Sequence, residues 1–151
     1  MGVPAQQVMS ILTPQEVQTL GGLPGQAVAG LLVGPFGSPG SFRPNRVFVD
    51  FLHDVVRSAG PTDPELQAAA QAQGEGSVVI VDLRTPEGPQ GRVPPEDILG
   101  AFEVKAGQLV PGSYLANPNY VVLTRHGLVR LPPGLRAAFV HSLPRVSQSS
   151  A

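Results

Sequence analysis

The sequence has no cysteine, no tryptophan and a single lysine, Lys105, among its 151 residues. Without cysteine it has no disulfide framework, no thiolate metal site and no cysteine nucleophile. Charged residues make up 14% of the chain, well below the ~25% of average soluble domains, and the net charge is −1. This balance argues against nucleic acid as a partner, because proteins that bind nucleic acids present a basic surface to the phosphates.

Long hydrophobic runs are also missing. The longest apolar stretch, residues 27–33, is far shorter than the ~20 residues needed to span a bilayer. The first residues carry no basic segment of the kind that opens a secretory signal. We therefore expect a soluble, cytoplasmic protein that needs neither a membrane nor a cofactor.

Glycine and proline, in contrast, are abundant, with 18 and 17 residues. They cluster between segments with regular hydrophobic patterns, at residues 21–25, 34–40, 86–95, 111–118 and 132–134. Because 42% of the residues are hydrophobic, the chain has material for a core and is not a low-complexity segment. We expect one domain over residues 1–146 and a flexible tail over residues 147–151.

The N-terminal half carries the signals of three helices. Thr13 and Glu16 can form a capping box around Pro14, and Gly21 should end that helix. Residues 44–58 show the clearest helical period, with apolar side chains on one half and a polar arc on the other. That polar arc consists of Arg46, Asp50, His53, Asp54 and Arg57. A third helix should begin at Asp63 and end before Gly74, whereas residues 26–33 are too short to classify.

The C-terminal half favours strands. Residues 78–81, Val-Val-Ile-Val, are typical of a strand buried on both faces. Residues 101–105 and 108–110 should form one hairpin, and residues 120–123 and 128–131 a second. Apolar residues at every fourth position from Leu135 predict a closing helix. The fold class predicted is α+β, with N-terminal helices followed by a mainly antiparallel sheet and a C-terminal helix.

One group of residues resembles a known catalytic core. Asp82 ends a predicted strand, and Glu103 and Lys105 follow as Glu-x-Lys on the next strand. This pattern resembles the PD-(D/E)XK nucleases, in which two carboxylates bind Mg²⁺ and the lysine helps to activate the attacking water. The resemblance implies a metal-dependent nuclease, although a solvated lysine before a turn explains Lys105 equally well.

A second short match follows the strand at residues 120–123. Arg125, His126 and Gly127 resemble the nucleophile motif of the histidine phosphatases, in which the histidine takes the phosphoryl group. The match covers about eight residues and stands near the end of the chain instead of the beginning. A hairpin turn, in which Gly127 supplies a positive φ, is the structural alternative.

Two further groups have a structural and a functional interpretation. Asp50, His53 and Asp54 share one helical face and could hold a divalent metal, but ion pairs with neighbouring arginines explain them as a solvated face. In the loop over residues 110–119, Tyr114, Asn117 and Asn119 are suited to contact a partner. The asparagines could equally form Asx-turns that hold the loop to itself.

The scarcity of charge decides between these interpretations. A surface with few charges and a net charge near zero favours association. We therefore expect a protein that acts through protein–protein contact, as a homo-oligomer and most simply a two-fold dimer, without catalytic machinery or a metal. The predicted contact residues are Tyr114, Asn117, Asn119, Arg125 and His126. The alternative is the Mg²⁺-dependent nuclease that uses Asp82, Glu103 and Lys105.

Overall fold

The structure is a computed structural model that describes residues 6–33, 42–84, 93–124 and 126–144. The first part is a three-stranded antiparallel sheet in the order β1-β2-β3. Its strands are β1 (Gln6–Ser10), β2 (Val28–Val33) and β3 (Phe42–Pro44). The connection from β1 to β2 contains helix α1 (Pro14–Leu20) and the 3-10 turn η1 (Gly25–Ala27).

The middle of the chain is helical, and the second half forms another antiparallel sheet. Helix α2 (Arg46–Ala59), the turn η3 (Gly60–Thr62) and helix α3 (Pro64–Gln73) follow one another. The second sheet has β5 (Ile98–Lys105) paired with β4 (Gly76–Val81), β6 (Gln108–Leu109) and β7 (Leu115–Ala116). The turn η4 (Pro95–Asp97), the hairpin of β8 (Leu123–Thr124) and β9 (Gly127–Leu128), and helix α4 (Pro133–Ser142) complete the described chain.

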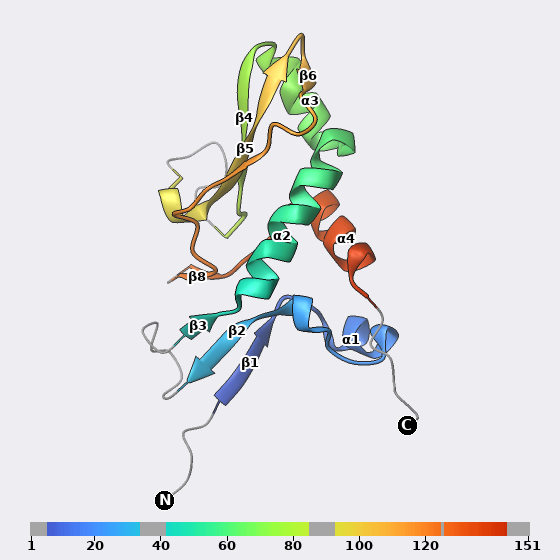
Figure 1. The fold of residues 1–151 in the computed structure, drawn as a ribbon, viewed down its shortest axis with the longest axis vertical. Coiled ribbons are helices and arrows are strands. Elements are labelled where there is room, and N and C mark those ends of the chain that lie inside the picture. The colour runs from blue at the N-terminus through green and yellow to red at the C-terminus, as the bar shows by residue number, and fades with distance from the viewer. Residues whose placement is uncertain (1–5, 34–41, 85–92, 125, 145–151) are drawn as a thin grey trace, which may run out of the picture.

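Helix α2 joins the two halves of the molecule (Figure 1). It runs from the first sheet toward the second, and α4 packs beside it. Phe48 and Phe51 of α2 meet Phe139 of α4 edge to face, with ring centroids 5.6 and 5.3 Å apart. Phe48, Phe102 and Phe139 are completely buried, so the core is continuous from α4 through α2 to β5.

Local sequence signals explain the ends of these elements. Thr13 and Glu16 form the predicted capping box, and Gly21 ends α1 with a φ of 80°. Asp63 caps α3 by accepting the backbone N–H of Leu66 at 3.1 Å. The predicted hairpin between β5 and β6 is confirmed, and both of its turn residues, Ala106 and Gly107, have positive φ.

The α+β class is confirmed, but the order of elements differs at the N-terminus. The first described element is strand β1, and residues 28–33 form β2, so a sheet accompanies the first helices. The pattern of β1 is too short to indicate a strand. The predicted tail over residues 147–151, and most of the predicted loops at residues 34–40 and 86–95, lie outside the described residues.

Two expectations about burial are wrong. The strand at residues 78–81 is not buried on both faces, because Val79 is 47% exposed between the buried Val78 and Ile80. In α2, His53 is only 9% exposed although it belongs to the predicted polar arc, whereas Val47 is 54% exposed. Both residues lie at the margins of the apolar stripe, where the elements packed against the helix decide which side is covered.

The helices of the described ranges are short. The longest, α2, has 14 residues, fewer than the ~20 that cross a bilayer. Within these ranges no helix is both long enough and apolar enough to be a membrane span.

Candidate functional site

Asp82, the first residue of the predicted nuclease motif, belongs to a buried cluster of polar side chains. Its Oδ2 accepts the Tyr120 hydroxyl at 2.7 Å, and its Oδ1 accepts the backbone N–H groups of Arg84 and Arg130, each at 3.0 Å. The pKa of Asp82 is raised above its ordinary value because burial outweighs the hydroxyl of Tyr120, the charge of Arg84 and the two N–H groups, which lower it. Three donors to one carboxyl group indicate the ionised form at neutral pH.

Arg84 balances this charge from within the same cluster. Its Nε donates to Asp97 Oδ1 at 2.8 Å, and it lies 3.6 Å from Asp82 Oδ2. The four remaining N–H groups donate to main-chain carbonyls, those of Glu96, Val121, Val122 and Gly127. All five donors of the guanidinium group are therefore used. The cluster fixes the ends of β4 and η4 to the segment before β8, and it leaves no donor of Arg84 for a ligand.

The nuclease residues do not converge. Asp82 follows Val81, which is paired with Ile98, whereas Glu103 is paired with Ser77. Five residues along a strand correspond to about 16 Å. Glu103 and Lys105 are exposed, and their Oε1 and Nζ atoms lie 3.7 Å apart. Within the described ranges no group of three histidine or acidic side chains could hold a metal ion, so these residues do not form the Mg²⁺ site that the nuclease motif requires.

The phosphatase motif falls in the second predicted hairpin, which is confirmed in shortened form. Strands β8 and β9 pair through Leu123 and Leu128, and Gly127 has a φ of 112°. The backbone N–H of His126 donates to Thr124 Oγ1 at 3.1 Å. Arg125 lies outside the described residues, so its predicted contact role stays a prediction. The arrangement described is that of a turn.

The loop residues predicted to contact a partner are used within the molecule. Asn117 donates from Nδ2 to the carbonyls of Pro95 and Ile98, both at 2.8 Å, and its Oδ1 accepts the backbone N–H of Asn119 at 3.1 Å. This is the Asx-turn alternative. Tyr114 is 4% exposed, so it cannot present a contact surface. Asn119 is exposed and stays available.

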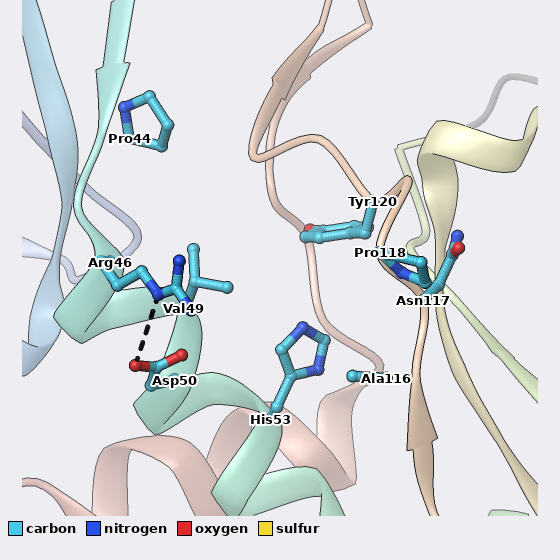
Figure 2. A pocket seen from close by; sticks show the side chains of 9 residues that line it. All are labelled: Pro44, Arg46, Val49, Asp50, His53, Ala116, Asn117, Pro118 and Tyr120. Atoms are coloured by element: carbon cyan, nitrogen blue, oxygen red, sulfur yellow. Dashed lines mark ion pairs between the residues drawn. The ribbon is translucent and has the colours of Figure 1, made fainter.

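A groove lies between α2 and the segment that follows β7, with a volume of about 360 Å³. Figure 2 shows its lining: Val49, Asp50 and His53 stand on the helix, and Ala116, Pro118 and Tyr120 face them. Arg46 and Asp50 form a loose ion pair at the rim, with Nε and Oδ2 3.8 Å apart. The groove thus unites part of the predicted polar arc of α2 with the predicted binding loop.

His53 is the one histidine in this lining, and a hydrogen bond with Tyr114 holds its ring in place. Its Nδ1 lies 2.8 Å from the hydroxyl oxygen of Tyr114, which in turn lies 3.2 Å from the carbonyl oxygen of Leu99. Burial lowers the pKa of His53, and the charge of Arg57 lowers it further, whereas Asp50 and Asp54 raise it. Burial also raises the pKa of Tyr114, so its hydroxyl keeps its proton.

The other ring nitrogen of His53 faces the groove. Nε2 has no hydrogen-bond partner in the part of the chain that the structure describes. Every completely buried side-chain nitrogen or oxygen in the described residues has a hydrogen-bond partner. Because Nε2 has none, it is not completely buried, and solvent reaches it from the groove. The edge of this ring points toward the ring of Tyr120, with centroids 6.4 Å apart (Figure 2).

A second hollow of about 290 Å³ shares Pro44, Val49 and Tyr120 with this groove. Its remaining lining is apolar and consists of Phe42, Val121, Val122 and Leu123. The two hollows therefore lie next to each other along Pro44, Val49 and Tyr120; His53 lines the first, and the second has hydrocarbon walls.

The open face of the second sheet is a separate candidate surface. Val79, Ala101 and Leu115 are directly opposite one another on β4, β5 and β7 and so share a face. We call these three residues the outer row. Leu115 is 76% exposed and Val79 47%. The helices lie against the other face of this sheet, where Val78 and Phe102 are buried (Figure 1).

Sequence reasoning missed the Arg84–Asp97 pair and the burial of His53. Both depend on contacts between distant segments, since His53 and Tyr114 are 61 residues apart. For the outer row the sequence does hold a signal, because the continuous apolar run at residues 78–81 indicates more apolar surface than one sheet face covers.

Comparison of the chain with protein family models, with curated proteins and with solved structures gives no match, so the site must be interpreted from its own geometry.

Proposed function

We propose that the protein acts through protein–protein contact as a homodimer, and that a second copy covers the outer row. The observation that carries this proposal is the apolar row of Val79, Ala101 and Leu115 on the open face of the second sheet. Natural sheets keep polar side chains on a face that meets water, and a hydrophobic face is normally packed.

The sequence pattern supports the same conclusion. Residues 78–81 have the composition of a strand buried on both faces, yet one face of β4 leaves Val79 exposed in the monomer. A partner on that face would give β4 the surroundings that its sequence indicates. The low content of charged residues, 14%, favours association in the same way.

The charges beside the row favour a second copy over a strongly charged partner. Glu103 follows Ala101 on the same face of β5, and Lys105 follows Glu103. They lie 3.7 Å apart and are both exposed. A surface with one charge of each sign attracts neither a polyanion nor a polycation, but it can complement a copy of itself in a two-fold arrangement.

The row is small beside the ~800 Å² that each partner contributes to a standard interface. We therefore expect a dimer with a dissociation constant of about 1–100 µM. Sedimentation equilibrium between about 1 and 500 µM brackets that range and should show a mass that rises from the monomer value of 15.7 kDa toward twice that value.

A matched pair of variants tests the surface itself. Leu115→Glu places a charge at the β7 end of the outer row, on its most exposed residue, and should keep the protein monomeric throughout the concentration range. Val8→Glu makes the same change at a valine of β1 that is 55% exposed on the other sheet, and it should leave dimerisation unchanged. A wild-type protein that stays monomeric at every concentration, or a Leu115→Glu variant that dimerises like wild type, would contradict the proposal.

A further inference from the structure

We propose that the groove between α2 and the segment after β7 binds a small, neutral aromatic molecule that carries one O–H or N–H donor, with the donor on His53 Nε2. This site is independent of the dimer surface. On β7 the side chains alternate, so Leu115 belongs to the outer row while Ala116 lines the groove.

The walls of the groove fix the apolar part of the ligand. Tyr120 and Pro118 face Val49 and Pro44 across it, and Phe42 and Leu123 line the neighbouring hollow, which is also apolar. The groove, at about 360 Å³, is at the small end of the range for ligand sites, and the neighbouring hollow, at about 290 Å³, is just below it. An aromatic ring system can lie against the ring of Tyr120 with its edge or its face.

The hydrogen bonds of His53 and Tyr114 determine which polar group the ligand must carry. The hydroxyl of Tyr114 has one hydrogen, and two neighbours within reach, His53 Nδ1 and the Leu99 carbonyl. The carbonyl can only accept, so both contacts are satisfied when Tyr114 donates to Leu99 and Nδ1–H donates to Tyr114. In that tautomer Nε2 carries the lone pair and accepts a hydrogen bond from the groove.

The charges around the imidazole agree with a neutral ligand. Asp50, Asp54 and Arg57 surround it on α2 itself, and burial lowers its pKa, so the ring is uncharged at neutral pH. From the opposite side come Tyr114 and Tyr120, and the hydroxyl of Tyr120 is bound to Asp82. Arg46 and Asp50 at the rim offset each other. An ionic ligand would find no unopposed charge among these groups.

The two tyrosines provide the assay, because the chain has two tyrosines and no tryptophan. Tyr120 lines the groove and Tyr114 lies beneath His53. Naphthol added to the monomeric Leu115→Glu variant, and to wild type, should quench tyrosine emission saturably with a dissociation constant of about 0.1–1 mM, as expected for a ligand of this size. Equal binding to both proteins would separate this site from dimerisation.

Methoxynaphthalene is the matched probe, since it has the same rings without the donor. It should bind about tenfold more weakly than naphthol, the factor that one hydrogen bond contributes. The His53→Leu variant should bind the two probes equally, whereas His141→Leu, at an exposed position of α4, should keep the tenfold preference. Absence of saturable quenching, or equal binding of both probes to wild type, would overturn the proposal even if His53→Leu fails to fold.

Discussion

At the scale of single residues, Glu16 and Arg136 show how one ion pair can hold two helices together. Arg136 Nη1 and Nη2 donate to the two carboxylate oxygens of Glu16, both at 2.8 Å, and Thr13 N–H adds a third bond at 2.8 Å. The hydrogen bond from Arg136 is the largest cause that lowers the pKa of Glu16 to about 2. The side chains are only 25% and 33% exposed, so water screens this pair less than a surface pair.

This pair makes the stability of the protein depend on pH in the acid range. A carboxyl whose pKa is lower in the folded state stabilises above its unfolded pKa, and that stabilisation disappears as the pH falls from about 4.5 to about 2. Glu16→Gln should therefore lower the free energy of unfolding by about 2 kcal/mol at pH 7 and by much less near pH 2. Urea denaturation at both pH values measures the difference.

Glu65→Gln is the control, because Glu65 is exposed in the first turn of α3. It should change the free energy of unfolding by less than about 0.5 kcal/mol at either pH. If Glu16→Gln destabilised the protein equally at pH 7 and pH 2, packing would be the cause instead of charge.

At the scale of elements, the hairpin of β5 and β6 stores a small strain. Ala106 has a φ of 51°, and it is the one described residue other than glycine with a positive φ. An alanine in this region costs about 1 kcal/mol, whereas asparagine adopts it readily and forms the preferred Asn-Gly turn with Gly107. The turn is also fixed to α3, since the backbone N–H of Gly107 donates to the Gly74 carbonyl at 2.9 Å.

Ala106→Asn should therefore stabilise the protein by about 0.5–1 kcal/mol, seen as a higher urea midpoint with an unchanged slope. Ala68→Asn, at an exposed position in the middle of α3, should act in the opposite direction because asparagine is a weaker helix former than alanine. Loss of stability in the Ala106 variant would show that the φ of this turn is not a source of strain.

The same scale explains how the outer row arises. Strand alternation gives β4 an inner and an outer side, and the inner side receives Val78 and Ile80. All four residues of this run are apolar and β-branched, so alternation places an apolar side chain on the outer side as well. Val79 therefore meets water in the monomer. The proposed dimer is the consequence of this pattern at the next scale up.

At the scale of the whole molecule, Arg84 connects segments that are distant in sequence. Its guanidinium group reaches Glu96 and Asp97 beside β5, Val121 and Val122 before β8, and Gly127 in the last hairpin. It also lies over the ring of Tyr120, with the guanidinium carbon 5.3 Å from the ring centroid. The groove wall at Tyr120 is therefore positioned by a buried ion cluster.

Arg84→Met should be strongly destabilising, by about 3–5 kcal/mol, because it leaves buried carboxylates and carbonyls without their donor. A change of that size would lower the melting temperature of a chain of this length by roughly 10 °C or more. Circular dichroism during heating measures it. Arg46→Met, which breaks an exposed pair, should shift the melting temperature by only about 2 °C or less.

A loss below about 1 kcal/mol in Arg84→Met would mean that the cluster is dispensable. In that case the position of Tyr120, and with it the groove, would need another explanation. Naphthol quenching in the same variant gives the second readout, because a displaced Tyr120 weakens the binding of the probe.

Much of the fold can be predicted from the sequence, because caps and turns depend on signals within a few neighbouring residues. The capping box at Thr13, the cap at Asp63 and the positive φ of Gly107 are each decided by the residue and its near neighbours. The α+β class follows from the change of period between the helical and the strand segments. Strand β1 escapes prediction because it has only five residues and its pairing partner lies beyond α1.

The candidate site can be predicted only in pieces. The polar arc of α2 and the loop with Asn117 each stand out in the sequence, but no local pattern shows that they face each other across a groove. The helical period places His53 at the edge of the polar arc, so its burial depends on what packs against it. Tyr114, which contacts its Nδ1, is 61 residues away in the sequence. Asp82 resembles a metal ligand because a lone carboxylate at a strand end gives no sign of Arg84 and Tyr120 as its partners.

The sequence alone thus determined the fold class, the caps, the turns and the scarcity of charge, since each depends on composition or on neighbours along the chain. Tertiary structure decided that Asp82 is a structural acid, that His53 is buried with one nitrogen open to a groove, and that Val79 and Leu115 form an exposed row. The physical reason is that burial and hydrogen-bond partnership are properties of packing, which brings together residues that no short sequence pattern connects.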